Sequence, residues 1–400
     1  MARIGIYGGS FNPPHIGHVQ AAKDAKAFLE LDEVLVIPAA IPPHKALAEG
    51  SPDAKTRFRL AELAFCKEDG FSVSDLELCR QGASYTVDTL RQLHAERPGD
   101  TLVLLMGTDM LLSFPTWREP EAICKLAELA CFSRYRDEAA AEQMRQQETA
   151  LEEQFGTPVT LVPNDCVEIS STEVRRLLFF GCAGAYLPTE VLRKIEEEGL
   201  YGVGEPCRNL PFEELKETCL RLHKEKRVPH VLGCVELAEK LAAQYGENAE
   251  SARRAAILHD VTKALTYEQQ IEYCRVWSVP LSESDRSQPQ LLHAITAADA
   301  ARRIFGESEA VCSAIRWHTT GKADMTRLEK IVYIADMVEK TRSYPGVAAI
   351  REALRRDLDE GVRQGLGRTI EHLEERGLAV SPESQEALCF LRTGSVNTGK

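Results

Sequence analysis

The feature that most constrains the fold is a change in the spacing of apolar residues near Pro211. Before this point, short apolar runs typical of strands alternate with helical segments, from RIGIYGG at residues 3–9 to PVTLVP at residues 158–163. Beyond it, apolar residues recur only at helical spacing, as in FEELKETCLRLHKEK at residues 212–226. Because βα alternation predicts a parallel sheet covered by helices, we expect an α/β domain with a doubly wound parallel sheet, followed by an all-α domain.

The two domains are expected at residues 1–203 and 211–395, because YGVGEPCRNL at residues 201–210 combines two glycines with a proline and is typical of a linker. A chain of 400 residues also exceeds the length at which a single core usually keeps growing. Within the first domain we expect helices around residues 55–67 and 119–129 and a solvent-facing helix over residues 137–154. The ligand of a doubly wound sheet is expected at the carboxyl ends of its strands.

The charge balance argues against a general nucleic-acid binder, since 48 Lys and Arg face 61 Asp and Glu, a formal net charge of −13. The amino terminus lacks the basic and apolar segments of a secretory signal, and no apolar run reaches the roughly 18 residues of a membrane span. Twelve cysteines without a CxxC pair indicate reduced, mostly structural thiols. We therefore expect a cytoplasmic protein that binds neither nucleic acid nor membrane, with a homo-oligomer left open.

The first candidate site is GGSFNPPHIGH at residues 8–18, directly after the first apolar run. Gly8 and Gly9 allow a tight turn and close approach of a phosphate. Two prolines then present His15 and His18 where the next helix begins, and a helix start attracts anions. The pattern therefore predicts a phosphate site, although two surface histidines at a helix cap would produce the same HxxH spacing.

The same stretch resembles the nucleotidylyltransferase signature of the HxGH type, and its long form with FNPPH is similar to bacterial nicotinate-nucleotide adenylyltransferases. Further motifs recur in that family's order: PPHK at 42–45, SYTVDTL at 84–90, MGTDMLLSFPTW at 106–117 and ISSTEVRRLL at 169–178. The resemblance covers about the first 201 residues and implies a Rossmann-like domain. It also implies adenylyl transfer from ATP to nicotinate mononucleotide, with another phosphorylated acceptor such as a pantetheine phosphate as the rival.

The resemblance also implies the roles of individual residues. His15 and His18 would stabilise the phosphates of ATP, with Lys45 and Arg175 adding positive charge. Mg²⁺ is expected to arrive with ATP. The remaining nucleotide-binding positions are the glycine loop, the hydroxyl run before a helix, a ribose-binding carboxylate and two residues lining the pyridine ring: Gly8, Gly9, Ser10 and Phe11; Ser170, Ser171 and Thr172; Asp109; Thr86 and Trp117. The hydroxyl run could equally be an ordinary helix cap, and Trp117 taken alone would more often be a core residue.

The second candidate site begins with LHD at residues 258–260, on a predicted helix. Adjacent helical residues diverge by roughly 100°, so His259 and Asp260 can share a metal only where a pocket lies between them. The same half of the chain also carries His230, His293, His318 and Asp336. A carboxylate within an apolar helical run is costly unless it binds a cation. Imidazoles with carboxylates suit Fe, Mn, Co or Zn.

In this order the residues resemble the HD-domain metal-dependent phosphohydrolases. HTTG followed by YIADMVE, together with HVLGCVELAEKLAAQYG, is similar to the bacterial HD hydrolases that split symmetrical diadenosine tetraphosphate into two ADP; the resemblance spans about residues 212–393. It implies one or two divalent metals, Fe first. The first would be held by His230, His259, Asp260 and Asp336, and the second by His293 and His318. Asp260 would also be catalytic. Hydrolysis of another nucleotide phosphoester, or nucleotide sensing without turnover, remains the alternative.

Overall fold

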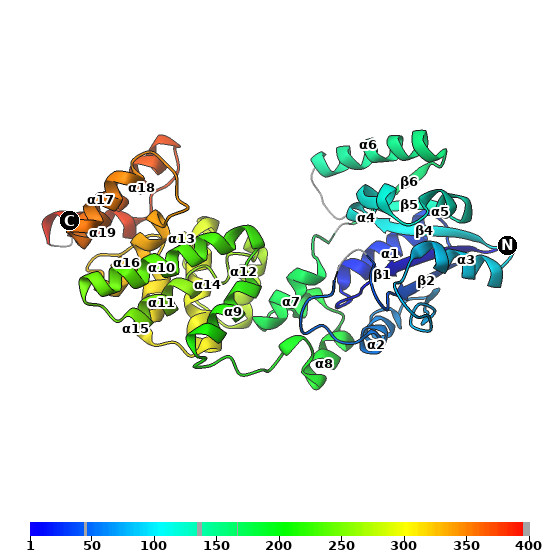
Figure 1. Ribbon diagram of the computed structural model, residues 1–400, viewed down its shortest axis with the longest axis horizontal. Coiled ribbons are helices and arrows are strands. Elements are labelled where there is room, and N and C mark those ends of the chain that lie inside the picture. The colour runs from blue at the N-terminus through cyan, green and yellow to red at the C-terminus, as the bar shows by residue number, and fades with distance from the viewer. Residues whose placement is uncertain (44–45, 134–137, 166, 395–400) are drawn as a thin grey trace. The chain divides into compact units, whose positions relative to one another are not determined.

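The computed structural model describes residues 1–43, 46–133, 138–165 and 167–394. The chain divides into two compact units, Met1–Glu205 and Pro206–Lys400. In Figure 1 the first unit runs from blue to green and contains the sheet, whereas the second runs from green to red and is helical. The expected domain limits at residues 203 and 211 lie on either side of this division.

The first unit is built on a six-stranded parallel sheet with the order β3-β2-β1-β4-β5-β6. This is the doubly wound order. Strands β2 and β3 follow on one side of β1 and strands β4 to β6 on the other, and this reversal of strand order leaves a crevice at the carboxyl ends of β1 and β4. The sheet is Rossmann-like, as the alternation of strand and helix predicts. The strands are β1 (Arg3–Gly9), β2 (Glu33–Pro38), β3 (Phe71–Val73), β4 (Thr101–Gly107), β5 (Glu128–Phe132) and β6 (Val159–Val162).

Helices connect these strands and complete the unit. One apolar core, which includes Ile4, Leu104 and Leu129 of three different strands, joins the sheet to α3 and α6. The helices are α1 (Ile16–Phe28), α2 (Ala54–Phe65), α3 (Thr86–Glu96), α4 (Thr108–Ser113), α5 (Pro120–Leu126), α6 (Glu138–Phe155), α7 (Ser171–Phe179) and α8 (Thr189–Glu198).

One boundary differs from the expectation. The helix expected over residues 119–129 is α5, which begins at Pro120 and ends at Leu126. Residues 128 and 129 instead begin β5, and Leu129 lies beside Leu104 of β4 with 1% of its side chain exposed. The apolar run continues from helix into strand without a glycine or proline, so the sequence pattern alone did not separate the two elements.

The second unit is entirely helical among its described residues, as expected. No described helix of either unit is both long and apolar enough to cross a membrane. The helices are α9 (Phe212–Leu222), α10 (Val228–Tyr245), α11 (Ala249–Leu258), α12 (Tyr267–Val276), α13 (Glu283–Ser287), α14 (Leu292–Ala300), α15 (Glu309–Arg316), α16 (Arg327–Val338), α17 (Val347–Arg356), α18 (Leu358–Glu375) and α19 (Pro382–Thr393).

Candidate functional sites

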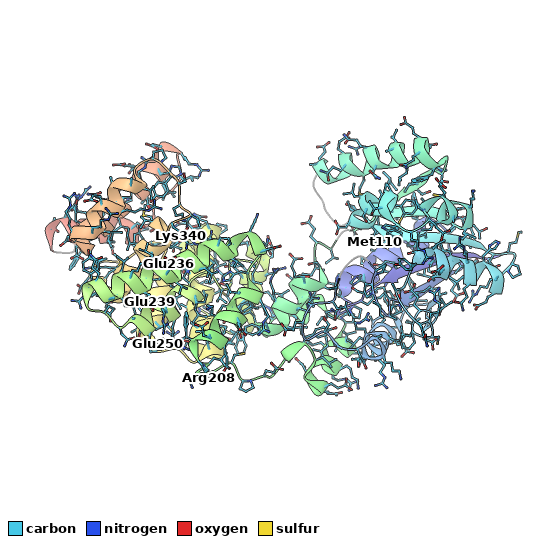
Figure 2. The ribbon with its side chains drawn as sticks, viewed as in Figure 1. Met110, Arg208, Glu236, Glu239, Glu250 and Lys340 are labelled. Atoms are coloured by element: carbon cyan, nitrogen blue, oxygen red, sulfur yellow. The ribbon has the colours of Figure 1, made fainter. Side chains whose placement is uncertain are left out.

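A pocket of about 330 Å³ lies at the carboxyl ends of β1 and β4 in the first unit. Its walls include Met110 of α4, which Figure 2 labels, and Asn12 of the loop after β1. Ten residues expected at the nucleotide site line this pocket: Gly8, Gly9, Ser10, His15, His18, Asp109, Ser170, Ser171, Thr172 and Arg175. The structure therefore brings together the loop after β1, the start of α4 and the start of α7.

The two histidines lie side by side at the start of α1. Their ring centroids are 3.7 Å apart. The backbone N–H of His15 donates to Nδ1 of His18 over 3.2 Å, so Nε2 of His18 carries the proton and can donate to a phosphate. Gly17 makes room for this arrangement, because a Cβ there would lie 3.1 Å from Nδ1 of His15. The glycine of the HxGH pattern thus has a packing role.

The loop that carries the histidines is held from two sides. From one side, Arg175 of α7 donates to the carbonyl of Asn12 over 2.5 Å, and the Ser171 hydroxyl donates to the carbonyl of Pro13 over 2.9 Å. From the other, Arg57 of α2 donates to the carbonyls of Ser10 and Ala39 with only 1% of its surface exposed. Burial lowers the pKa of Arg57, which we still expect to be charged. Sequence reasoning missed Arg57, since an arginine within a helical pattern looks like a surface residue.

The hydroxyl run at the start of α7 forms a helix cap. Ser170 accepts from the backbone N–H of Glu173 over 3.3 Å, and the Glu173 carboxylate accepts from the backbone N–H of Ser170 over 2.8 Å. Thr172 accepts from Arg175 over 3.1 Å. The hydroxyls are therefore engaged with the protein, and the backbone N–H groups of the first helical turn are the donors that a phosphate could use.

In the second unit, the structure gathers all six expected metal ligands in one place. Nε2 of His230 lies 3.0 Å from Oδ1 of Asp336, and Nε2 of His259 lies 3.4 Å from Oδ2 of Asp260. Nε2 of His293 lies 3.2 Å from both Oδ1 of Asp260 and Nε2 of His318. These side chains come from five different segments, so only the tertiary fold brings them together.

The sequence pattern predicted that His259 and Asp260 lie within a helix. In the structure they do not. Helix α11 ends at Leu258, and both residues follow it in a turn. His259 keeps helical backbone angles, φ −54° and ψ −36°, and its side chain and that of Asp260 reach the same cluster. Beyond the helix end, the Thr262 hydroxyl donates to the carbonyl of His293 in α14 over 3.1 Å, so the turn packs against that helix.

The donor set fits a divalent transition metal. Nδ1 of His259 lies 2.6 Å from the carbonyl of Ala256, and Nδ1 of His318 lies 2.7 Å from the carbonyl of Ile315. Each Nδ1 therefore donates to a backbone carbonyl, which leaves each Nε2 facing the carboxylates, the orientation found in histidines that bind metals. The side chain of Asp260 is 1% exposed, and besides the histidines it accepts from the guanidinium of Arg227 over 2.8 Å.

Electrostatics keep both carboxylates charged. Burial alone would raise the pKa of Asp260, but the surrounding His259, His293 and His318 hold it well below its ordinary value. Burial likewise opposes ionisation of Asp336, and the contact with His230 lowers its pKa. Burial favours the neutral imidazole of His293 and lowers its pKa to about 4. Burial opposes protonation of His259, but the neighbouring Asp260 outweighs it and raises the pKa of His259, so a cation that binds here competes with that proton.

Donor distances divide the cluster differently from the expected pairing of ligands. One group with all donor atoms within 4.8 Å contains His230, Cys234, His259 and Asp336, and a second contains His259, Asp260 and His318. Cys234 was not expected. It lies one helical turn after His230 on α10, with Sγ 3.5 Å from Nε2 of His230.

Glu339 is a second residue that sequence reasoning missed. Its carboxylate Oε1 lies 3.0 Å from Nδ1 of His230, and it is completely buried. A Cβ on Gly233 would lie 2.3 Å from Oε2 of Glu339, so the missing side chain at residue 233 makes room for this carboxylate. Carboxylates that accept from the far nitrogen of a ligand histidine orient the ring and raise its basicity.

Comparison with known proteins identifies each unit separately. The cytidylyltransferase-like family matches residues 6–177, and the HD domain family matches residues 227–341. A probable nicotinate-nucleotide adenylyltransferase of Shouchella clausii is 36% identical over 203 residues, covering 50% of this chain and 98% of the relative. One of Geobacter metallireducens is 38% identical over 212 residues, with the same coverage. The N-terminal half of this chain belongs to the nicotinate-nucleotide adenylyltransferase family. The C-terminal half carries an HD domain.

Solved structures resemble each half of the chain. A predicted HD superfamily hydrolase involved in NAD metabolism from Clostridium acetobutylicum is 33% identical, with a TM-score of 0.45; the match covers 46% of this chain and 99% of that structure. The nicotinic acid mononucleotide adenylyltransferase of Plasmodium falciparum, complexed with NaAD, is 19% identical, with a TM-score of 0.41; it covers 51% of this chain and 99% of that structure.

Three described residues predicted from the resemblance to nicotinate-nucleotide adenylyltransferases are not among those lining the 330 Å³ pocket. Lys45, a further predicted residue, lies outside the described residues. Phe11 is 1% exposed at φ 44°, and its ring packs 5.1 Å from that of His18. Trp117 is 8% exposed within the core, and its ring centroid lies 5.4 Å from that of Phe114. Thr86 begins α3.

The segments that carry Thr86 and Trp117 nevertheless approach each other. The guanidinium of Arg118 lies 4.6 Å from the ring centroid of Tyr85. Arg91 of α3 donates to the Glu119 carboxylate over 2.6 Å. The binding of a pyridine ring between these segments stays a prediction, because Trp117 would have to leave part of its packing against Phe114 to stack on a ligand.

Proposed function

We propose that the N-terminal unit transfers the adenylyl group of ATP to nicotinate mononucleotide, giving deamido-NAD and pyrophosphate. The observation that carries this proposal is the convergence of His15, His18 and Arg175 on one pocket at the switch point of the sheet. A phosphate oxygen of the mononucleotide attacks the α-phosphorus of ATP, and the bond to pyrophosphate breaks as the new P–O bond forms. No covalent nucleophile of the protein is needed, so positioning and charge stabilisation supply the catalysis.

Each group in the pocket has a defined part in this reaction. Nε2–H of His18 donates to the phosphate oxygens that gain negative charge, and His15 supports the same phosphates beside it. Arg175 and the first turn of α7 hold the departing pyrophosphate. Asp109, exposed at the start of α4, accepts from the ribose hydroxyls. Mg²⁺ bound to ATP would shield the triphosphate charge.

The test of this proposal is the rate of deamido-NAD formation from ATP and nicotinate mononucleotide. His18→Ala should lower this rate at least a hundredfold, because a charge-stabilising donor is lost. His94→Ala, at an exposed position near the end of α3, is the matched control and should retain the wild-type rate. A near-normal rate in His18→Ala, or a preference for a pantetheine phosphate, would contradict the proposal. Thermal melting checks that both variants are folded.

We further propose that the HD domain hydrolyses diadenosine tetraphosphate to two ADP. A water attacks one of the two central phosphorus atoms, the bridging P–O–P bond between them breaks, and each half leaves as ADP. A bound divalent cation, Fe²⁺ first with Mn²⁺, Co²⁺ or Zn²⁺ as alternatives, would activate the water and neutralise the phosphates. His230, His259, His293, His318, Asp260 and Asp336 would hold one or two such ions. We expect both activities in the cytoplasm.

The second activity is tested with the full-length protein reconstituted with Fe²⁺, Mn²⁺ or Co²⁺ and incubated with diadenosine tetraphosphate. ADP as the sole product on ion-exchange chromatography, abolished by Asp260→Ala, would support symmetrical hydrolysis. The His18→Ala protein provides the reciprocal control, since it should hydrolyse the dinucleotide at the wild-type rate. No turnover with any of the three metals would overturn the proposed hydrolysis and favour another phosphoester or a nucleotide-sensing role.

A further inference from the structure

A pocket of about 460 Å³ opens beside the metal ligands of the HD domain. His318 and Asp336, two of the predicted ligands, line it. Helix α16 also contributes Tyr333 and Met337, and α18 contributes Arg368, Thr369 and His372. Helix α18 carries none of the predicted metal ligands, and the HD family match ends at residue 341, before this helix begins.

Positive charge is distributed along this pocket. Nearest the metal ligands, Arg342 donates to Oδ1 of Asp336 over 2.6 Å and to its backbone carbonyl over 2.8 Å. Farther along the chain, the guanidinium of Arg368 lies 3.6 Å from Glu371 and 3.5 Å from Glu375, whose side chains are 66% and 59% exposed. Exposed ion pairs of this length contribute little stability, so a phosphate can replace these carboxylates at low cost.

The remaining walls are aromatic and apolar. Tyr344 is half-buried, and its hydroxyl donates to the carbonyl of Met337 over 3.2 Å, which fixes the ring beside the pocket. Met337 and Leu373 supply apolar surface from α16 and α18. Guanidinium groups recognise phosphates through paired hydrogen bonds, and aromatic rings stack on bases. The volume is at the lower end of that of small-molecule sites, as a single nucleotide requires.

We propose that this pocket binds one nucleoside diphosphate unit of the substrate, with Arg342 on the phosphate next to the scissile bond and Arg368 of α18 on the following phosphate. The base lies against Tyr344 and Leu373. This inference rests on the proposed phosphohydrolase function and deepens it. Residues of α18, outside the HD family match, determine that the substrate is a nucleotide and not a simple phosphoester.

The experiment measures binding of ADP to the full-length, Mn²⁺-loaded protein by isothermal titration calorimetry, together with KM and kcat for diadenosine tetraphosphate. Arg368→Gln should weaken ADP binding to the HD domain at least tenfold and should raise KM more than it lowers kcat. The matched control is Arg363→Gln on the same helix, where Arg363 pairs with Glu360 over 2.6 Å away from the pocket lining. Any ADP bound at the N-terminal pocket contributes equally to all three proteins.

Each outcome separates the inference from the function on which it rests. An ADP isotherm that is the same in wild type and Arg368→Gln would overturn the inference, even if diadenosine tetraphosphate is hydrolysed. ADP binding that depends on Arg368 in a protein that does not hydrolyse the dinucleotide would support the nucleotide pocket and contradict the proposed hydrolysis. Circular dichroism and metal content of the Arg368→Gln protein show whether the variant is folded and loaded.

Discussion

At the residue scale, we expect Glu339 to determine how firmly His230 holds a cation. Its buried carboxylate accepts from Nδ1 of His230 and also from the backbone N–H of Thr341 over 2.6 Å. Glu339→Gln removes the negative charge while keeping the size of the side chain. We expect the affinity of the HD domain for Mn²⁺ or Co²⁺ to fall about 10- to 100-fold, measured by competition with a chromophoric chelator.

Glu236 provides the matched control for this substitution. It lies on α10, the helix that carries His230. Its carboxylate accepts hydrogen bonds from Nζ of Lys340 over 2.6 Å and from Nζ of Lys240 over 2.7 Å. Figure 2 labels Glu236 and Lys340 on the second unit. Because these ion pairs are exposed, Glu236→Gln should leave metal affinity unchanged. Equal metal affinities for Glu339→Gln and the wild type would show that the carboxylate only fills space beside Gly233.

The limits of sequence reasoning are clearest at this scale. The predicted metal ligands were recognisable because histidines and aspartates stood in apolar surroundings at ordered positions. Glu339 was not, since a glutamate in VEK looks like a solvated charge until the fold places it 3.0 Å from a histidine 109 residues earlier. Trp117 shows the opposite problem: the same residue type suits a core and a stacking site, and only its surroundings distinguish them.

At the element scale, a capping box fixes the start of α16, the helix that presents Asp336. The Glu329 carboxylate accepts from the backbone N–H of Thr326 over 2.7 Å, from the Ser313 hydroxyl and from Lys322 over 3.0 Å, and the residue is 1% exposed. Burial alone would raise the pKa of Glu329, but these donors outweigh it and lower the pKa below 4.5. The helix start is therefore tied to α15 by a buried charge.

This lowered pKa predicts an acid-sensitive contribution to stability. A carboxyl group whose pKa is lower in the folded state stabilises the protein above its unfolded pKa, and the stabilisation is lost as pH falls through the folded value. Glu329→Gln should therefore cost about 1–3 kcal/mol at pH 7, with the difference from wild type shrinking below about pH 4. The measurement is the denaturant midpoint of the C-terminal unit at steps from pH 7 to pH 3.

Glu352→Gln serves as the control for this pH series. Glu352 is exposed on α17, where it pairs with Arg355 over 3.0 Å, so its replacement should change stability little at any pH. A difference between Glu329→Gln and wild type that stays constant from pH 7 to pH 3 would contradict the role of the ionised carboxylate.

The order of the elements could be read from the sequence, whereas their ends could not. Each expected strand and helix of the first unit is present, because alternation of apolar runs records which surfaces are buried. The end of α5 and the end of α11 depended on packing. Leu129 pairs with Leu104 of the neighbouring strand, and His259 follows the end of α11 and lies beside the other predicted metal ligands. Tertiary contacts of this kind leave no local periodicity in the chain.

At the scale of the whole molecule, the change of pattern near Pro211 corresponds to two separate cores. The sheet unit buries Leu104 of β4 with 2% exposed, and the helical unit buries Ile331 of α16 completely. The proposed activities are then assigned to different units, each with its own pocket. The substrates of the two units need have nothing in common except the adenine nucleotide that both proposals include.

Two cores predict two heat-absorption peaks in differential scanning calorimetry of the full-length protein. Leu104→Ala should lower one midpoint and Ile331→Ala the other, since a buried Leu or Ile truncated to Ala costs about 2–5 kcal/mol, roughly 5–15 °C for a unit of this size. Removing metal with a chelator should lower only the peak that Ile331→Ala moves, because ligands stabilise the unit that binds them. A single peak shifted by both substitutions would show that the two cores unfold together, and a chelator shift in the Leu104→Ala peak would place the metal in the wrong unit.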